Sequence, residues 1–467
     1  MAMKSDLDAA LQKHEYSWPG DPLDERWIRS PAGDKVRPMP ETADELRQDS
    51  RWPAFFPSPI CLVTVRAGDE VALEKVVGAS IVNRFPYVLA VSFCRENLSD
   101  RHHPRRRFME LLEKGGAANA QFLAPGPQLD RAMRAIADMP EDQTSRRIAA
   151  SGLGFRRGES NSAPVLDDAY MVYEGHLAKS SAGFGGEPVY GHPWADVGSH
   201  RVYFLEIDCI QLREEVAEGR RHVHWRSLPL WEPQLPFQPR DPLPPPAREF
   251  QATYQRNYTP HYVFPSAATA GFEGHERKNG MAIKHLAPLP ADQVEVDNDR
   301  ARWPCFFPSS LALISSWAGP GRPNVAPCGS TLVLSRSPLI IACCLSYARI
   351  NARYAPRASI EFLRKTGAFG CGVPFIHDRV VAAIMRLGLV SHREDPDKVA
   401  RAGFAVADGA AVPLLPALPV QFECKVVGEL ALGTHAMFLG EVQRIHVRAD
   451  VKPTNPLTWC PWSYVGP

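Results

Sequence analysis

The chain has 467 residues, of which 45% are hydrophobic, so it is long enough for two or three domains with ordinary cores. Lysine plus arginine number 53 and aspartate plus glutamate 52, and this balance gives no reason to expect a nucleic acid or an acidic membrane as partner. The N-terminus carries acids and has no apolar core segment, and no run of about 18 apolar residues occurs anywhere. We therefore expect a cytoplasmic protein without a signal peptide or a membrane span.

The chain contains a long internal repeat. Residues 51–65 (RWPAFFPSPICLVTV) return as residues 302–316 (RWPCFFPSSLALISS), with about eight of the fifteen positions identical. Residues 104–120 likewise run against residues 356–372 without a gap. Repetition at so long a separation predicts two domains that share one fold.

We divide the chain into an N-terminal arm (residues 1–50), a first barrel domain (51–230), a proline-rich linker with a second arm (231–300), and a second barrel domain (301–467). The first arm is polar and contains proline, and we expect it to wrap the first domain. Trp231–Pro246 is too rich in proline to form a helix or a central strand. It is expected to be an extended, stiff linker.

Short apolar runs bounded by Gly, Pro and Ser predict strands in both domains. In the first domain the strands are Ile60–Val65, Val88–Phe93 and Tyr203–Ile210, with a helix at Arg107–Leu112 and an insertion between about Gly154 and Val197. In the second domain they are Leu311–Ser316, Leu339–Leu345, Val420–Gly428 and Met437–Val447, with helices at Ser359–Lys365 and Asp378–Leu387. This order does not alternate as in a doubly wound sheet, and it favours small antiparallel barrels with helices packed outside.

One segment of the second domain is a candidate anion site. Residues Gly321–Thr331 (GRPNVAPCGST) place small residues and hydroxyls between two predicted strands, and Ser335 follows them. A loop of this composition lets backbone amides approach an anion. The same residues are also ordinary turn formers, so both interpretations stay open.

A series of motifs runs in order through residues 303–447: Phe307-Pro308 through Ser315, Asn324 to Ser330, Ser337-Pro338 with the apolar strand after it, the helix start at Ser359, Thr366–Phe369, Ala402–Phe404, Phe422–Lys425, Gly433–His435 and Phe438–Val442. As a set, these motifs resemble the flavin reductase-like family of FMN-binding split barrels. No single motif would suffice.

The resemblance implies a mainly β fold with helices, in which two tandem split β-barrels of six strands form an intrachain pseudo-dimer. In relatives with a single domain, a homodimer holds FMN at its interface, with the phosphate near the small-residue loop and the helix after the third strand. The cofactor contacts carried over by this resemblance are Asn324, Gly329, Ser330, Thr331, Ser335, Ser346, Arg353, Arg357 and Ser359. Arg353 or Arg357 would supply the positive charge that a desolvated phosphate needs.

The candidate catalytic residues are His435 and His200, each preceded by glycine and a hydroxyl residue. The resemblance places His435 near the flavin ring and the nicotinamide. A buried histidine that satisfies a loop carbonyl is the alternative interpretation. A structural role predicts that both histidines are buried by their own barrel, whereas a catalytic role predicts that at least one faces an open cleft.

The first domain departs from the family pattern. The Gly-Arg-Pro-Asn loop is missing, and Lys75–Ser80 reads as a shorter connection in which Gly78, Ser80 and Asn83 are partial substitutes. Arg105 and His200 match Arg357 and His435. We therefore expect one competent flavin site, built mainly by the second domain.

These expectations describe an FMN-dependent oxidoreductase of the flavin reductase-like type, with NAD(P)H as the donor of hydride or electrons and a small-molecule substrate or free flavin as partner. The chain would be a monomeric pseudo-dimer or a homodimer. One alternative is an FMN-dependent enzyme with a dedicated small organic substrate, as in secondary metabolism. The other is a flavin-free binding or scaffold protein that kept the barrel.

The sequence predicts no metal site and no disulfide framework. The ten cysteines include no Cys-x-x-Cys pair and lack regular spacing, so reduced and mostly buried thiols are expected. His222 and His224 alternate along a strand-like segment, but without a third ligand nearby they read as exposed strand histidines.

Overall fold

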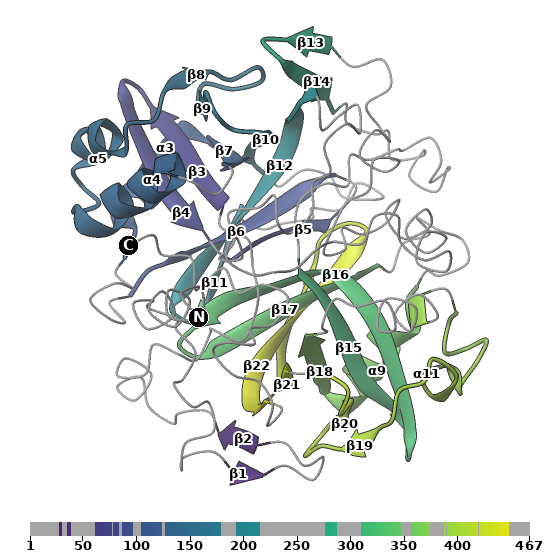
Figure 1. Cartoon of the computed structure of the whole chain (residues 1–467). Coiled ribbons are helices and arrows are strands. Elements are labelled where there is room, and N and C mark those ends of the chain that lie inside the picture. The colour runs from purple at the N-terminus through teal and green to yellow at the C-terminus, as the bar shows by residue number, and fades with distance from the viewer. Residues whose placement is uncertain are drawn as a thin grey trace, which may run out of the picture.

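The computed structural model describes residues 28–29, 35–38, 61–76, 78–83, 86–96, 104–123, 127–178, 193–214, 276–286, 310–346, 356–373, 387–388, 390–418 and 420–447. These residues form mainly strands with some helix, as predicted, and the strands build two barrels (Figure 1). No helix among them is long and apolar enough to cross a membrane. The eight cysteines that are described are buried and free, as expected. The repeated motif at 51–57 and 302–308, the proline-rich linker, His222 with His224, and nearly all of the helix predicted at Asp378–Leu387 lie outside the described residues.

Six strands of the second barrel form a closed ring. They are β15 (Ser310–Gly319), β16 (Arg322–Arg336), β17 (Leu339–Ser346), β18 (Ala368–Val373), β21 (Val420–Ala431) and β22 (His435–Val447). The pairing runs β22-β17-β16-β15-β18-β21, and β21 pairs with β22 again, always antiparallel. Helices α9 (Ala358–Thr366) and α11 (Lys398–Arg401) and the short strands β19 (Ala407–Asp408) and β20 (Pro413–Leu414) lie outside this ring.

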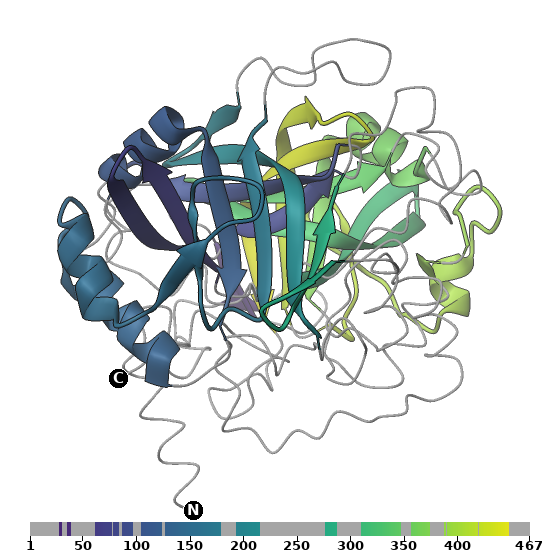
Figure 2. The ribbon, with the colours of Figure 1, turned by 90° about the horizontal axis from the view of Figure 1, so that it is seen from above.

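The first barrel has the same order of pairing. Its strands are β3 (Cys61–Ala67), β4 (Glu70–Val76), β5 (Ala79–Asn83), β6 (Val88–Cys94), β7 (Ala117–Phe122), β10 (Met171–Leu177) and β12 (His200–Arg213). They pair as β4-β3-β7-β10-β12-β6-β5, and because β4 and β5 are separated by residues 77 and 78 only, together they correspond to β16. Around them lie α3 (Arg106–Gly115), α4 (Pro127–Asp138), α5 (Thr144–Ser151), β8 (Phe155–Arg157), β9 (Pro164–Leu166) and β11 (Trp194–Val197). The helices cover the side of this barrel that faces away from the second one (Figure 2).

The segment that we considered as a candidate anion-binding loop or turn is a strand. Residues 322–336 form the single strand β16, whose first part pairs with β15 and whose last part pairs with β17. Pro323 and Pro327 lie in the part that pairs on one side only, where a residue without an N–H group is tolerated. Only Gly321, in the left-handed region at φ 64°, lies in the hairpin before the strand.

The connection at Lys75–Ser80 is not shortened, contrary to our expectation, and the first barrel is one residue shorter only in the hairpin before it. Val76 pairs with Cys61 as Cys328 pairs with Ala312, and the next paired residues, Ala79 and Thr331, follow three positions later in both barrels. The inserted residues lie elsewhere: residues 178–199 separate β10 from β12, whereas residues 432–434 separate β21 from β22.

The repeat between residues 104–120 and 356–372 does contain a gap. The backbone N–H of Arg105 bonds to Cys94 O as that of Arg357 bonds to Ser346 O, each at 3.0 Å. The helices that follow end at the left-handed glycines Gly116 and Gly367, and they have 10 and 9 residues. Helix α3 is therefore one residue longer than α9.

Each arm pairs with the barrel that does not directly follow it in the chain. Strand β2 (Lys35–Pro38), which pairs with β1 (Ile28–Arg29), pairs with residues 444–447 of β22, whereas β14 (Met281–His285), which pairs with β13 (Glu276–Lys278), pairs with β12. The expectation that the first arm wraps the first domain is therefore wrong. The reason is that β22 extends beyond Glu441, the last residue paired with β17, and the added strand covers this open edge.

The barrels pack on each other through an apolar cluster with members from both, among them Val82, Val88, Val202 and Phe204 from the first and Leu332, Leu334, Ile340 and Met437 from the second. Figure 1 shows β5, β6, β16 and β17 where the two barrels meet. Gly78 lies in this contact, because a Cβ atom there would come within 2.5 Å of Val333 O. A larger residue at position 78 would therefore push the barrels apart.

The polar contacts between the barrels are reciprocal. Thr434 donates from its backbone N and its Oγ1 to Asn83 Oδ1, at 2.9 and 2.8 Å. Ser199 donates from its backbone N to Ser335 Oγ at 3.1 Å, and the two hydroxyl oxygens lie 3.2 Å apart. Asn83 and Ser335 hold the same place in their barrels, since each is the first paired residue after a shift of register. The same contact thus occurs twice, with the barrels exchanged.

We expect Asn83→Ala to lower the free energy of unfolding by about 2 kcal/mol, because it leaves two buried donors of Thr434 without their acceptor. Urea denaturation measures this loss. Gln443→Ala removes an exposed amide from β22 and is the control, with an expected change below about 0.5 kcal/mol. Equal stability of the two variants would contradict the importance of this contact.

A buried carboxylate stands at the same place in each barrel. Glu423 accepts hydrogen bonds from two backbone N–H groups of the β19–β20 turn, at 2.8 and 3.1 Å, and lies 2.6 Å from His446 Nε2. Glu174 accepts from two backbone N–H groups of the β8–β9 turn, at 3.0 and 2.9 Å, and from the side chain of Gln211. Each carboxylate therefore ties its outer hairpin to the barrel wall.

Candidate functional site

The start of α9 gathers several of the predicted cofactor residues. Strand β17 ends at Ser346, whose carbonyl accepts the backbone N–H of Arg357 at 3.0 Å. Arg357 is the N-cap of α9, and its side chain makes no capping hydrogen bond. The first N–H groups of a helix have no partner within it, so this end can accept an anion.

Asn324 positions a hydroxyl group at the same helix start. Its Nδ2 donates to Ser359 Oγ at 3.0 Å and lies 3.4 Å from Ser316 Oγ. Both partners of the shorter bond are buried, with Asn324 1% and Ser359 3% exposed. The amide on β16 therefore fixes the serine in the first turn of α9, and the two predicted residues lie together.

His435 lies next to this site at the contact between the barrels. It pairs with Ser346 across β22 and β17, and its Nδ1 is 2.8 Å from Thr434 Oγ1. That hydroxyl donates to Asn83 of the first barrel, so it is placed to accept a hydrogen bond from Nδ1 of His435. His435 is 6% exposed and His200 is half-buried, so the expectation for a purely structural role, that both are buried by their own barrel, is not met.

The remaining predicted residues do not all join this group. Ser335 faces the first barrel, where it bonds to Ser199 beside His200. Thr331 donates to Cys328 O within its own strand at 3.3 Å, and on the same strand Gly329 is buried and Ser330 is half-buried. Arg353 lies outside the described residues.

Two basic residues near α9, Lys398 and His392, were missed by our sequence analysis. Lys398, at the start of α11, is 5% exposed and donates to Leu387 O at 3.2 Å and Val390 O at 3.1 Å. Burial, together with the charge of Arg357, lowers the pKa of Lys398 to about 7. Burial and the charge of Lys398 also lower the pKa of His392, whose ring lies edge-on to Phe362 of α9 at 5.2 Å.

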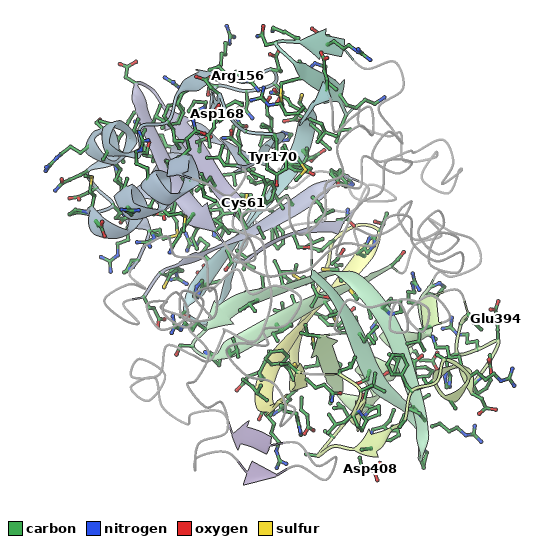
Figure 3. The ribbon with its side chains drawn as sticks, viewed as in Figure 1. Cys61, Arg156, Asp168, Tyr170, Glu394 and Asp408 are labelled. Atoms are coloured by element: carbon green, nitrogen blue, oxygen red, sulfur yellow. The ribbon has the colours of Figure 1, made fainter. Side chains whose placement is uncertain are left out.

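These residues belong to a charged segment, residues 391–398 (SHREDPDK), that is typical of an exposed turn. One signal could have revealed Lys398: it follows Arg147 by 251 residues, the same separation that relates the two copies of the repeated motif. In Figure 3, Glu394 marks this segment at the outer side of the second barrel.

The first barrel lacks the polar pair of this site. Its register places Ala72 where the second barrel has Asn324, because Thr64 pairs with Leu73 as Ser315 pairs with Val325. At the position of Ser359, the second residue after the N-cap, α3 has Arg107, which is bound to Glu70. The hydroxyl and the amide that meet in the second barrel are therefore both absent at these positions.

A groove of about 670 Å³ opens at the β8–β9 hairpin of the first barrel. It is lined by Arg66, Arg156, Arg157, Glu159 and Ser160, among others, and includes none of the predicted site residues. Arg156 lies at the end of the molecule opposite to Glu394 and Asp408 of the second barrel (Figure 3). This groove is separate from the site at α9.

Residues 304–466 match the model of a protein family described as flavin reductase like domain. The match covers the second barrel and not the first. It makes the second barrel a flavin reductase-like domain and supports a flavin-related oxidoreductase role. No curated protein matches the chain.

Among solved structures, a flavoredoxin of Desulfovibrio vulgaris (Miyazaki F) is 22% identical, over 30% of this chain and 70% of that one, with a TM-score of 0.26. A flavoredoxin from Methanosarcina acetivorans is 19% identical over 32% and 77% of the two chains, with a TM-score of 0.27. The nitrilotriacetate monooxygenase component B from Bacillus cereus is 17% identical over 30% and 70%, with a TM-score of 0.26. The family match, and not these scores, carries the assignment.

Proposed function

We propose that the chain is an FMN-dependent oxidoreductase of the flavin reductase-like type, which takes hydride or electrons from NAD(P)H. In this proposal the two barrels are tandem copies that form an intrachain pseudo-dimer. The observation that carries it is the site at α9, in the barrel that matches the flavin reductase like domain. Asn324, Ser359 and Arg357 meet there at an uncapped helix start.

The reciprocal contacts between the barrels support the pseudo-dimer. A twofold interface uses the same patch on both partners, so residue i contacts j and j contacts i. Asn83 with Thr434 and Ser335 with Ser199 follow this rule. The equal order of strand pairing in both barrels and the exchange of arms between them point the same way.

The residues at the start of α9 fit the phosphate of FMN. A buried dianion needs cations and hydrogen-bond donors, and Arg357, the Ser359 hydroxyl and the first N–H groups of α9 provide both. When bound, the isoalloxazine ring supplies the redox chemistry. The chain anchors the phosphate, and Thr434, which is bound to Asn83, orients the ring of His435 through Nδ1.

The proposal assigns one flavin to each chain. The first barrel has Ala72 and Arg107 in place of Asn324 and Ser359, so it lacks the donors that hold the phosphate. It contributes Asn83 instead, which orients Thr434 and through it His435. In this proposal the first barrel forms one side of the flavin site in the second barrel and holds no flavin itself.

His435→Ala is expected to slow turnover by about 100-fold while FMN affinity changes by less than about tenfold, because the imidazole acts on the reacting end and not on the phosphate. Stopped-flow reduction by NADH and NADPH, beside an FMN titration, separates the two effects. Unchanged turnover in a folded variant would remove His435 from the mechanism.

The experiment that tests the proposal is an absorption spectrum of the purified protein, with mass identification of the bound group and a coupled assay of NAD(P)H oxidation. We expect a flavin spectrum and FMN. Protein that neither carries nor takes up flavin would contradict the proposal and favour a scaffold. Bound FMN that NAD(P)H reduces only slowly, in the absence of a partner, would favour an enzyme with a dedicated substrate.

A further inference from the structure

The groove at the β8–β9 hairpin of the first barrel is rich in arginine. Its volume of about 670 Å³ is within the range of sites that hold small organic molecules. It is lined by three arginines, Arg66 of β3 with Arg156 and Arg157 of β8, and by Glu159, Ser160 and Asn161 of the hairpin loop. Figure 1 shows this hairpin at the end of the first barrel that faces away from the second. The proposed flavin chemistry does not use these residues.

The arginines of the groove are not neutralised by ion pairs. Among the described residues, Arg66 and Arg157 form no ion pair with a carboxylate. Arg156 donates from Nη2 to Gln211 Oε1 at 2.7 Å, and this partner is a neutral amide. The one carboxylate in the lining, that of Glu159, lies 2.8 Å from Lys278 Nζ. The groove therefore has an excess of positive charge.

A buried carboxylate at the hairpin offsets one of these charges. Glu174 accepts hydrogen bonds from backbone N–H groups of the hairpin loop and from Gln211, the partner of Arg156. Burial lowers the pKa of Arg156, and the charge of Glu174 opposes this shift. Arg213 and Asp167, which also act on Arg156, have opposite charges. Two positive charges remain, so a ligand with two negative charges would balance the groove.

The second barrel builds the same hairpin without arginines on its first strand. Arg157 pairs with Pro164 as Asp408 pairs with Pro413, and a glycine follows each first residue. Both hairpins are bound by a buried glutamate through backbone N–H groups. Ala407 and Asp408 therefore hold the places of Arg156 and Arg157.

The third arginine is also specific to the first barrel. Thr64 Oγ1 donates to the carbonyl of Pro164, as Ser315 Oγ donates to that of Pro413. Two residues further along each strand, on the same face, are Arg66 and Trp317. The second barrel thus closes this hairpin with none of the three arginines, so the fold does not require them.

We propose that this groove binds a small organic dianion, a phosphate monoester or a dicarboxylate, whose charged groups accept hydrogen bonds from Arg66, Arg156 and Arg157. A guanidinium group presents its donors in a planar fork that matches both kinds of anion. Phe155 and Pro164, which also line the groove, offer apolar contact to the carbon part of the ligand. The inference goes beyond the proposed function, because it gives the barrel without flavin a ligand of its own.

Calorimetric titration of the FMN-saturated protein with 5′-AMP and with phthalate tests the proposal. Bound FMN fills the site at α9, so an added dianion cannot bind there. We expect one molecule of at least one probe per chain, and adenosine, which lacks the phosphate, should bind at least about 100-fold more weakly than 5′-AMP if 5′-AMP binds. Binding of 5′-AMP alone would support a phosphate monoester, and binding of phthalate alone a dicarboxylate. Binding of neither would overturn the inference.

Arg157→Asp places the residue of the second barrel into the groove. We expect it to weaken dianion binding by about 100-fold, because one cation is lost and a repelling carboxylate is added. Arg134→Asp, the same change at an exposed arginine of α4 outside the groove lining, is the control and should stay within about twofold of wild type. Equal affinity in the two variants would overturn the inference.

Arg66→Trp tests the groove from a different strand. It also introduces the residue of the second barrel, and we expect it to weaken dianion binding by about tenfold. It decides the question should Arg157→Asp not fold, and affinity equal to wild type would then contradict the inference.

Failure of this inference is distinguishable from failure of the proposed function. Protein that takes up no FMN would contradict the proposed function, and the same titrations of the flavin-free chain and its Arg157→Asp and Arg134→Asp variants would still decide on the groove. Protein that binds FMN and neither probe would overturn this inference alone.

Discussion

Lys398→Met is expected to weaken FMN binding by about 100-fold, because it removes a buried cation whose charge acts together with that of Arg357, the arginine that the proposed function assigns to the phosphate. Methionine has a similar length and no charge, so the packing around α11 is largely kept. Isothermal titration with FMN measures the loss. Lys365→Met removes an exposed lysine at the other end of α9 and is the control. Equal FMN affinity in the two variants would contradict the role of Lys398.

The same variant changes how stability depends on pH. In the folded, flavin-free protein the pKa of Lys398 is lowered from 10.5 to about 7, so between these values the unfolded chain holds a proton that the folded chain lacks. Wild-type stability therefore rises with pH across this window, and the unfavourable burial of the charge is fully present below about pH 7. Lys398→Met should be most stabilising relative to wild type near pH 6 and lose this advantage toward about pH 10. Urea denaturation across this range measures it, and a constant difference between the proteins would be evidence against the buried charge.

Glu423→Ala is expected to lower the free energy of unfolding by about 3–5 kcal/mol, the usual loss when one partner of a buried ion pair is removed. The variant leaves His446 and two backbone N–H groups of the β19–β20 turn without their acceptor. Glu429→Ala, which removes an exposed partner of Arg364, is the control and should lose less than about 1 kcal/mol. Similar losses in both would show that the buried carboxylate is not important for stability.

Glu423 also makes the free energy of unfolding depend on pH in the acidic range. Burial by itself would raise the pKa of Glu423, but the hydrogen bond and charge of His446 and the two backbone N–H groups bring it below the ordinary value of 4.5. Its contribution to stability is therefore complete above about pH 4.5 and is lost as the pH falls through the lowered value. Glu423→Gln should flatten the dependence of stability on pH in this acidic window.

Much of the fold could be predicted because its strands are short apolar runs with clear ends. The runs expected at Leu339–Leu345 and Met437–Val447 are β17 and β22, with bounds that differ by at most two residues. Strand β16 was missed because glycine and proline mark loops in most proteins. Its pairing on one side only, which makes Pro323 and Pro327 acceptable, is a property of the closed barrel and not of the segment.

The candidate site was predictable only where its residues belong to the motifs that carry the family resemblance. Asn324 and Ser359 were expected from the resemblance, and the structure joins them by a hydrogen bond. Lys398 was not expected, because its burial depends on carbonyls of a neighbouring segment that no local pattern reveals. The exchange of arms was missed for the same reason, since the open edge of β22 exists only once the barrel has closed.

The two barrels differ in one buried charge on the strand that follows the first hairpin. In the first barrel Arg105 and Arg147 are held together by Glu74, and the cluster is complete within the chain. In the second barrel the corresponding cations are Arg357 and Lys398, and Ala326 holds the register position of Glu74.

The most direct test of this account is the number of FMN molecules that one wild-type chain binds, measured by titrating flavin-depleted protein and counting flavin by absorbance against protein by amino-acid analysis. The account predicts one FMN per chain, held by the second barrel. Two FMN molecules per chain would contradict the proposal that the first barrel lacks the donors that hold the phosphate, and none would contradict the assignment of the second barrel as the flavin site.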